Sequence, residues 1–383
     1  MEQSTLLYQT HVQVHLDNIR TNIESIRQRI GPRRKILIAV KANAYGHGAV
    51  EVSRMAAEIG VDFLGIATVP EAMQLRQAGI SLPILKFGPT FYGEIEPAII
   101  NDVTLPVCSI ESALETQQVS AKLNKKSPVH IKIDSGMGRV GVPVEQAVPL
   151  AQLIEHECPN LYLKGVFTHL PVSDSADQAF TIEQVKRFRT YADEIERAIG
   201  RKLDLIHCAN SGAVLGHPDA WMDMVRPGIM IYGYYPDKTT PRTIDLQPGL
   251  SFLTRVSFIK KVAKGDSIGY GRTWFAPVDT WIATIPVGYA DGFNRLFSNT
   301  GRVLINGASF RIVGRVCMDQ SMVDLGPATQ VKIGDPVVLI GKNGHNEITC
   351  DEWAEKLHTI TYEVTCQINS RVTRVFTSSN TGN

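Results

Sequence analysis

The amino-terminal part of the chain alternates short apolar runs with segments of helical periodicity. Up to about Tyr235, each run ends in a polar or glycine-rich turn and leads into a stretch with apolar residues at helical spacing. The clearest helix spans Asp177–Ile199, where Phe188, Tyr191 and Ile195 share one apolar stripe. The eight runs predicted as strands are Ile36–Val40, Phe63–Ala67, Ile84–Phe87, Thr104–Val107, Val129–Ile133, Gly165–Thr168, Leu205–Cys208 and Met224–Tyr232.

This alternation predicts an α/β fold. Nearly continuous apolar strands followed by helices indicate a parallel sheet that is buried on both faces. Eight such units in this length fit a closed (β/α)₈ barrel of the TIM type better than an open sheet. An open doubly wound sheet stays as the alternative, although its GxGxxG signature after the first strand is absent. The amphipathic segment Leu16–Ile30, opened by Asp17, predicts a helix that leads into the barrel.

The pattern changes after the barrel. Asp237–Pro248 is polar and rich in turn residues, which predicts a linker. Helical periodicity then survives only around Cys350–His358. We therefore predict two domains, a barrel over residues 1–240 and a mainly β carboxy-terminal domain over 241–383. The β-type runs of the second domain are Phe252–Val262, Trp281–Val287, Arg302–Ile305, Phe310–Val316, Met322–Asp324, Pro336–Ile340 and Val372–Phe376.

Composition narrows the class of protein. The 383 residues are 44% hydrophobic and 20% charged with a net charge of +1, so we expect a folded core and neither nucleic-acid nor membrane partners. No apolar run reaches the roughly 20 residues that span a bilayer, and Met1–Gln13 lacks the pattern of a signal peptide. No histidine spacing predicts a metal site. Free thiols and a cytoplasmic location are expected, because no CxxC pair occurs among Cys108, Cys158, Cys208, Cys317, Cys350 and Cys366.

Candidate chemistry lies where the predicted strands end. A barrel gathers its functional groups at the carboxyl ends of its strands. Lys41 is informative by itself, because a buried lysine is costly to desolvate and burial favours the neutral amine that forms a Schiff base. The alternative is a lysine that reaches solvent at the barrel rim. The polar residues that converge at the strand ends are Lys41, Asn43, Tyr45, Asp134, Arg139, His169, Asn210, Ser211 and Arg226.

A set of short motifs runs through both predicted domains. Each is weak alone, but a chance match to all of them in this order is negligible. The sequence thereby resembles the alanine racemases over almost its whole length. The motifs are Val40–Gly48 (VKANAYGHG), Asp134–Arg139 (DSGMGR), Thr168-His169, Asn210–Gly212 (NSG), Arg226–Gly228 (RPG), Gly269–Arg272 (GYGR), Gly288–Gly292 (GYADG), Cys317–Gln320 (CMDQ) and Tyr362-Glu363.

The resemblance implies an isomerase that interconverts L- and D-alanine for D-alanine biosynthesis. Lys41 would hold pyridoxal 5'-phosphate as a Schiff base and act as base on one face of the substrate, with Tyr270 as base on the other. Racemisation needs two opposed groups, since one proton leaves and another arrives on the opposite side of Cα. A phenol has a pKa of roughly 10, so Tyr270 needs supporting neighbours. His169 and Arg226 are the implied network, and His207 is expected to bond Arg226.

The resemblance also implies how cofactor and substrate are held. Arg226 would face the pyridine nitrogen and keep it unprotonated, because guanidinium does not release its proton. This favours reprotonation at Cα over transamination. Small residues after the last barrel strands commonly bind phosphate. The residues expected around the cofactor are Lys41, Tyr45, Arg139, His169, Asn210, Ser211, Arg226, Gly228, Ile229 and Tyr362, with the phosphate on Ser211, on the backbone N–H groups of Gly228 and Ile229, and on the phenols of Tyr45 and Tyr362.

The substrate carboxylate is expected to meet Arg139 and the backbone N–H of Met318, with Asp319 in a supporting role. Lys132 lies inside an apolar strand and matches a lysine that is often carbamylated in the family. The carbamate would pair with Arg139, and the alternative is a plain salt bridge with an acidic neighbour. Lys86, at the end of a predicted strand, has no explanation from the sequence.

In the family the two bases come from different subunits, so the resemblance implies a homodimer with shared active sites. Three alternatives differ in chemistry. A racemase for serine or many amino acids is disfavoured by the bulk of Tyr362, although Thr361 stands where relatives more often carry Asn, Pro or Ser. A decarboxylase of basic amino acids would use a cysteine-bearing loop, which Cys317 and Cys366 do not match. A pyridoxal-phosphate carrier would lack the second domain.

Overall fold

The computed structural model describes residues 6–378. The first five residues of the stretch assessed for a signal peptide therefore lie outside the described residues. The chain divides into two compact units. One spans Asn18–Gln247, and the other joins the described residues up to Asp17 with those from Pro248 onward. No helix within residues 6–378 is long and apolar enough to cross a membrane.

The unit Asn18–Gln247 is the predicted (β/α)₈ barrel. Its parallel strands follow the order β10-β2-β3-β4-β5-β6-β8-β9. The ring closes between the last and first of these, because Arg226 N donates to Ala209 O at 2.8 Å and Asp223 N to Ile206 O at 3.2 Å. The strands are β2 (Lys35–Ala39), β3 (Phe63–Ile66), β4 (Ile84–Lys86), β5 (Val103–Val107), β6 (Ser127–Asp134), β8 (Leu161–Phe167), β9 (Leu205–His207) and β10 (Met224–Val225), with β7 (Val142–Pro143) beside β6.

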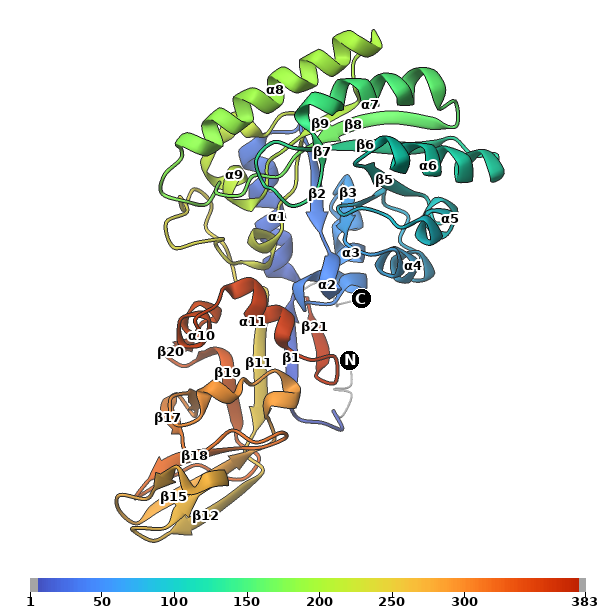
Figure 1. The fold of residues 1–383 in the computed structure, drawn as a ribbon. Coiled ribbons are helices and arrows are strands. Elements are labelled where there is room, and N and C mark those ends of the chain that lie inside the picture. The colour runs from blue at the N-terminus through green and yellow to red at the C-terminus, as the bar shows by residue number, and fades with distance from the viewer. Residues whose placement is uncertain (1–5, 379–383) are drawn as a thin grey trace. The chain divides into compact units, whose positions relative to one another are not determined.

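Helices surround this ring on its outer side (Figure 1). In α1 (Leu16–Ile30) the buried residues include Ile19, Ile23, Ile26 and Ile30, whose spacing forms one apolar face. The predicted helix Asp177–Ile199 is α8 (Ala179–Ile199). The remaining helices are α2 (Lys41–Tyr45), α3 (Ala49–Glu58), α4 (Val69–Gln77), α5 (Tyr92–Ile100), α6 (Ile110–Lys122), α7 (Val144–Glu157), α9 (Ser211–Gly216), η1 (Pro218–Ala220) and η2 (Ile229–Tyr232).

The eighth predicted strand was wrong in extent. The run Met224–Tyr232 forms only the two-residue β10, and Ile229–Tyr232 is the 3₁₀ helix η2. Pro227 has no N–H to give to a strand ladder, so the strand ends before Pro227-Gly228 despite the apolar residues that follow.

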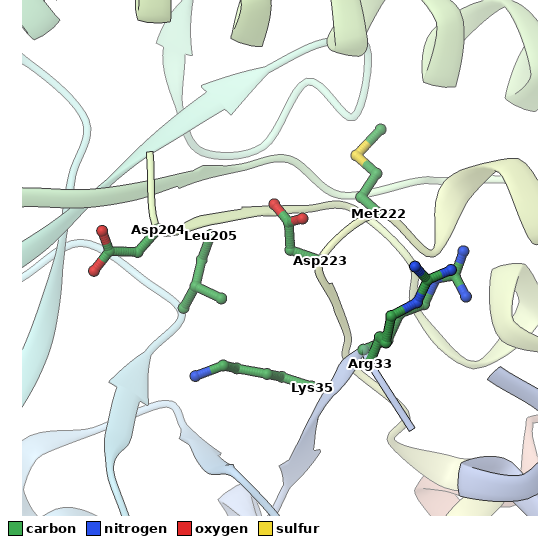
Figure 2. Close-up of a pocket in the computed structure, with 7 residues that line it drawn as sticks. Arg33, Lys35, Asp204, Leu205, Met222 and Asp223 are labelled. Atoms are coloured by element: carbon green, nitrogen blue, oxygen red, sulfur yellow. The ribbon is translucent and has the colours of Figure 1, made fainter. Parts of the chain in front are cut away.

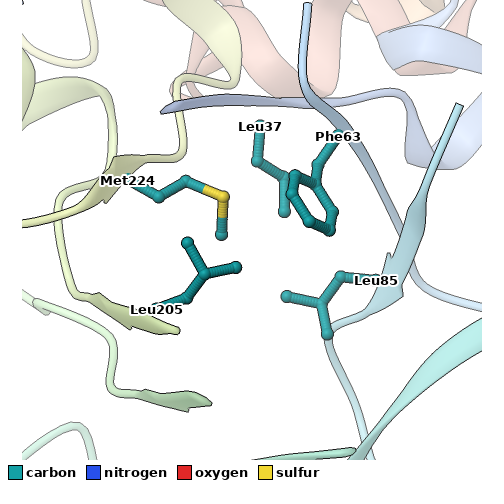
Figure 3. Close-up of a cluster of buried hydrophobic side chains, with 5 residues drawn as sticks. All are labelled: Leu37, Phe63, Leu85, Leu205 and Met224. Atoms are coloured by element: carbon teal, nitrogen blue, oxygen red, sulfur yellow. The ribbon is translucent and has the colours of Figure 1, made fainter. Parts of the chain in front are cut away.

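The barrel interior is a packed core. Leu37, Phe63, Leu85, Leu205 and Met224 come from five different strands and are at most 3% exposed (Figure 3). Burying a side chain of this size stabilises a fold by about 1.5–3 kcal/mol. The cluster therefore joins neighbouring and distant strands and fills the space between them.

A charged pocket of about 330 Å³ lies at the amino-terminal ends of the strands. Figure 2 shows Arg33 and Lys35, from the segment that opens β2, with Asp204 and Asp223 across the pocket. Asp223 accepts a hydrogen bond from Ile206 N at 2.8 Å. In this architecture the amino-terminal end serves stability, and catalytic groups are expected at the opposite end.

The second unit is mainly β, as predicted. Its ten-stranded sheet has the order β12-β15-β18-β17-β16-β19-β11-β1-β21, with β20 on β19. The sheet contains β1 (His11–His15), β11 (Leu250–Arg255), β12 (Phe258–Val262), β15 (Thr280–Ile285), β16 (Arg302–Ile305), β17 (Ala308–Ile312), β18 (Ser321–Gly326), β19 (Pro336–Asn343), β20 (Asn346–Ile348) and β21 (Thr373–Thr377). The other elements are β13 (Ser267–Ile268), β14 (Trp274–Phe275), η3 (Tyr270–Arg272), η4 (Tyr289–Asp291), η5 (Arg295–Phe297), α10 (Cys350–Leu357) and α11 (Thr361–Gln367).

Three features of this unit differ from the sequence analysis. The predicted strand Phe252–Val262 is two strands, β11 and β12, which pair with different partners. Helix α11 was missed because its seven residues are too few to show a clear period. The segment His11–His15 lies in this sheet, antiparallel to β11 and parallel to β21, although it precedes the barrel in the chain.

Candidate active site

Lys41 follows β2 and opens a left-handed turn. Ala42, Asn43, Ala44 and Tyr45 have φ angles of 51° to 54°. Residues with a Cβ avoid this conformation, which costs roughly 1–2 kcal/mol per residue. Such strain persists only where surrounding structure enforces it, and it gathers at functional sites. The turn therefore marks this end of the barrel as the candidate site.

Side chains hold the strained turn in place. Glu71 Oε1 accepts a hydrogen bond from Ala42 N at 2.7 Å, and its Oε2 accepts from Ala67 N at 2.8 Å. Asn43 Oδ1 accepts from Ala49 N at 2.9 Å. The sequence analysis missed Glu71. The Thr68-x-x-Glu71 spacing of a capping box was the available signal, because Glu71 also caps α4.

Three of the predicted cofactor residues meet beside this turn. Gly228 N donates to Ser211 Oγ at 2.9 Å, and a Cβ added to Gly228 would lie 2.8 Å from the hydroxyl of Tyr45. The Tyr45 ring lies 5.2 Å from that of Tyr232, whose hydroxyl donates to Ala39 O at 2.8 Å. We call Tyr45, Ser211 and Gly228 the cradle. It offers two hydroxyl groups around a residue without a side chain, which suits a phosphate.

Arg226 is buried and begins a chain of hydrogen bonds. It contacts His207 Nδ1 at 2.9 Å and donates to Thr168 O at 2.6 Å and Cys208 O at 3.1 Å. His207 Nε2 lies 2.9 Å from His130 Nδ1. The predicted Arg226–His207 bond is thus present, and His130 is an addition that the sequence did not indicate.

The arginine sets the tautomers of both histidines. Guanidinium only donates, so His207 Nδ1 accepts and the proton of the neutral ring lies on Nε2. His207 Nε2–H then donates to His130 Nδ1, which leaves the proton of His130 on Nε2. Burial first, and nearby positive charge second, lower the pKa of His207 and bring that of His130 to about 3. Both rings are therefore neutral at pH 7. Burial lowers the pKa of Arg226 to about 10, so it stays charged.

These protonation states predict an acid-sensitive barrel. The unfolded chain binds more protons than the folded one once the pH falls below about 6.5, so stability should fall from there toward pH 3. Each buried histidine contributes a slope of about 1.4 kcal/mol per pH unit. His130→Asn keeps an acceptor for His207 but does not titrate, so its unfolding free energy in urea should decline less between pH 7 and pH 5. The exposed His156→Asn is the control, and equal slopes in His130→Asn and the parent would contradict the assignment.

Basic side chains gather around Lys132 at this end of the barrel, because Arg226, Arg139 and Lys41 all act on its charge. Lys132 is buried, donates to Phe87 O at 2.7 Å, and lies 5.3 Å from the centre of the Phe167 ring. Burial and the charge of Arg226 lower the pKa of Lys132 to about 8. Among residues 6–378 no ion pair joins Lys132 to a carboxylate, and both the carbamate and the plain salt bridge stay predictions. His169 has a pKa of about 3, for which burial and then Arg226 are responsible. Such a site fits an anionic ligand.

Two further predicted residues lie in loops of this unit. Arg139 is exposed in the loop after β6, where Asp134 Oδ1 accepts from Gly136 N and Gly138 N at 3.0 Å each. Asn210 caps α9 by accepting from Ala213 N at 3.1 Å and donates to Leu170 O at 3.0 Å. Its amide therefore shapes the loop that presents Ser211. A direct contact of Asn210 or Arg139 with cofactor stays a prediction.

Lys86 gains a structural explanation. It is 3% exposed, donates to Gly88 O at 3.1 Å and to Pro89 O, and lies 3.8 Å from Glu94. Its ammonium thus satisfies the carbonyls of the turn between β4 and α5. The signal in the sequence was the position of Lys86 at the end of an apolar strand, where a lysine is able to reach the carbonyl groups of the turn that follows.

The remaining predicted residues belong to the second unit. Tyr270 lies in η3 between Gly269 and Gly271, which have φ angles of 75° and 71°, and it is 74% exposed. It lines a groove of about 530 Å³ together with Cys317 and Met322. Met318 and Asp319 lie on one loop, and Tyr362 lies in the first turn of α11, which begins at Thr361.

The fold and the strand ends define a barrel enzyme with a second, mainly β unit. One end of the barrel brings together Lys41, the cradle and the buried side chains of Arg226 and Lys132. Residues 14–236 match the family "Alanine racemase, N-terminal domain" and residues 250–376 match "Alanine racemase, C-terminal domain". The chain belongs to the alanine racemase family. The predictions of this family, of its fold and of an enzyme of the isomerase class are confirmed.

Individual relatives agree with this assignment. The alanine racemase of Cutibacterium acnes is 46% identical over 367 residues, which cover 95% of this chain and 97% of that protein. The structure of the alanine racemase of Clostridium difficile superposes with a TM-score of 0.92 at 37% identity, over 98% of this chain and 97% of that one. That of Bartonella henselae, with covalently bound pyridoxal phosphate, has a TM-score of 0.85 at 25% identity over 96% and 99% of the two chains.

Proposed function

We propose that this protein interconverts L- and D-alanine with pyridoxal phosphate, using Lys41 and Tyr270 as opposed acid/base groups. The observation that carries the proposal is the strained turn that places Lys41 at the end of the barrel that holds the cradle and the buried side chains of Arg226 and Lys132. Family membership supports alanine as the substrate.

The residues of the barrel fit the cofactor. Ser211 Oγ accepts from Gly228 N, so its hydroxyl proton is available to a phosphate oxygen, and the Tyr45 hydroxyl lies on the other side of Gly228. Ile229 N–H, Asn210 and Tyr362 are proposed to complete this site, with Lys41 as the point of attachment. Bound pyridoxal phosphate supplies an electron sink for the carbanion at Cα. Arg226 stays protonated, so it would donate to the ring nitrogen of the cofactor and would leave that nitrogen without a proton.

Two side chains would move the protons. Lys41 Nζ would take or give a proton on one face of Cα, and Tyr270 Oη would do so on the other. His169 is neutral at pH 7 because of its lowered pKa, and the one N–H that its neutral ring keeps would donate a hydrogen bond to the Tyr270 oxygen and so support the phenolate. Since Tyr270 is exposed in its own unit, a second copy of the chain is proposed to complete the site in a homodimer.

The substrate carboxylate is proposed to meet Arg139 and the N–H of Met318. The lowered pKa of Lys132 leaves part of the amine neutral near pH 7, and only the neutral amine adds to carbon dioxide. The ammonium first releases one proton, and the neutral amine then forms an N–C bond as one C=O π bond of carbon dioxide opens and a second proton leaves. These two losses would convert a buried cation into a carbamate anion near Arg226 and Arg139. This change would reduce the positive charge at this end of the barrel. A cytoplasmic location and a role in D-alanine supply stay predictions.

The function is tested by incubating the protein with pyridoxal phosphate and L-alanine in deuterated water. We expect D-alanine to form with deuterium at Cα. Chiral chromatography measures the D-alanine, and mass spectrometry measures its deuterium. A protein that binds the cofactor but leaves alanine unchanged is then tested with L-serine, L-lysine and L-arginine. Conversion of one of these would replace the proposal by a racemase of another specificity or a decarboxylase. If none of these amino acids is converted, the protein is a pyridoxal-phosphate carrier.

The cradle gives a prediction for cofactor affinity. Gly228→Ala would place a methyl group 2.8 Å from the Tyr45 hydroxyl, so the dissociation constant for pyridoxal phosphate should rise at least about tenfold, equivalent to ~1.4 kcal/mol. Gly216→Ala is the matched control, because its nearest heavy atom is Pro241 Cγ at 3.5 Å, an ordinary contact. Absorbance titration of the two apoproteins measures the difference. Equal affinities would show that the cradle does not hold the phosphate.

A further inference from the structure

Two loops of the second unit are joined by backbone contacts. Tyr289 N donates to Cys317 O and Ala290 N to Met318 O, both at 3.1 Å. Gly288 fits against this pair of carbonyls only because it has no side chain, since a Cβ there would lie 2.2 Å from Met318 O. Residues 288–292 and 316–320 therefore form one body, which we call the paired loops.

A buried carboxylate organises the first of these loops. Asp291 is 0% exposed and accepts from Gly288 N at 2.9 Å, which closes the turn that contains it. The Tyr8 hydroxyl lies 3.2 Å from Asp291 Oδ1 and donates to Pro286 O at 2.8 Å. A buried carboxylate without a cationic partner is costly, so the residue that supplies its positive charge matters for the whole turn.

Arg371 supplies that charge and also reaches the second loop. Its Nε lies 3.0 Å from Asp291 Oδ1 and its Nη2 donates to Asp319 Oδ1 at 2.9 Å. The backbone around it is fixed as well, because Asn369 N donates to Asp291 O at 3.2 Å and Arg371 N to Asn369 Oδ1 at 3.1 Å. One guanidinium thus holds a carboxylate on each of the paired loops, which a lysine cannot match with a single ammonium.

We propose that Arg371 is a positioning residue for substrate binding, which clamps the paired loops through Asp291 and Asp319 and so fixes the backbone N–H of Met318. Within residues 6–378 that N–H donates to no other group. Met318 itself is 53% exposed, so its own side chain does not hold it in place. The inference rests on the proposed function in one respect, the role of the Met318 N–H toward the substrate carboxylate.

The kinetic test compares Arg371→Ala with Arg302→Ala in the full-length protein loaded with pyridoxal phosphate. Arg302 is the matched control, because it makes a two-pronged pair with Glu352 at 2.8 and 2.5 Å in the same unit and does not touch the paired loops. We expect Arg371→Ala to raise the KM for L-alanine about tenfold with kcat changed less, which is the pattern of lost ground-state binding. The KM of Arg371→Lys should lie between those of the parent and Arg371→Ala, and Asp319→Asn should also raise the KM. The affinity for pyridoxal phosphate should not change in any of these variants.

Hydrogen–deuterium exchange gives a readout that does not depend on activity. In Arg371→Ala the amides of Gly288, Tyr289, Ala290 and Cys317 should exchange faster than in the parent, whereas Arg302→Ala should leave them unchanged. Unchanged exchange in Arg371→Ala overturns the positioning role. A KM equal to the parent's, in a parent that racemises alanine, overturns the link to substrate. If the parent does not racemise alanine but these amides exchange faster in Arg371→Ala, the proposed function is wrong, while the role of Arg371 in holding the paired loops is supported.

Discussion

Replacing Lys41 by alanine should abolish racemisation. The variant loses both the amine that would attach the cofactor and one of the two acid/base groups, and an acid/base group alone is worth about 10²–10⁴ in rate. We therefore expect kcat/KM for L-alanine to fall at least about 10⁴-fold. The cradle is untouched, so pyridoxal phosphate should still bind reversibly. Initial rates of D-alanine formation measure the effect, and absorbance measures the binding.

Lys41→Arg is the control that keeps the positive charge but does not form a Schiff base at neutral pH. It should be as inactive as Lys41→Ala. Activity in either variant within tenfold of the parent would mean that another group attacks the cofactor, and the assignment of Lys41 would be wrong.

Replacing Tyr270 by phenylalanine should stop inversion but leave exchange on one face. With only Lys41 present, a proton removed from Cα returns to the same face, so one enantiomer of alanine should gain deuterium from deuterated water without changing its configuration. Racemisation should fall about 10²–10⁴-fold, the usual contribution of an acid/base group. Tyr270 is 74% exposed in its unit, so the substitution should not disturb folding.

Tyr92→Phe is the matched control, since Tyr92 is also an exposed tyrosine and lies on α5, outside the paired loops. Each enantiomer is incubated separately, and chiral chromatography with mass spectrometry reports configuration and deuterium together. Equal loss of exchange for both enantiomers in Tyr270→Phe would point to a single base that serves both faces. Full racemisation by Tyr270→Phe would remove Tyr270 from the mechanism.

The strand pattern of the barrel was predictable because parallel strands that are buried on both faces have nearly continuous apolar sequences. The exception is Met224–Tyr232, where hydrophobicity alone does not distinguish a strand from a buried 3₁₀ helix. Pro227 was the available signal that the strand ends early. Short-range apolar patterns also gave no indication of the pairing of His11–His15, because its partners lie more than 200 residues away in the chain.

The position of Lys41 at the end of a barrel strand was predictable, whereas the contacts that support it were not. Motifs pointed to Lys41, and the (β/α)₈ plan placed it at a strand end. No local pattern predicted the left-handed turn after Lys41, because alanine and tyrosine do not favour positive φ and the turn depends on Glu71 from a later helix. His130 was hidden for a similar reason. It lies in an apolar strand, and only the folded barrel brings it to His207.

The position of β1 in the second sheet has a consequence for synthesis on the ribosome. His11–His15 emerges first, whereas its partner strands Leu250–Arg255 and Thr373–Thr377 are made after the whole barrel. At the usual ~5–20 residues per second, the first partner follows after roughly 10–50 seconds. During that interval the strand carries buried-type Val12 and Val14 with an unpaired backbone, which is the kind of segment that chaperones hold and that aggregates when they do not. The nascent chain is therefore expected to depend on such protection until β11 is released.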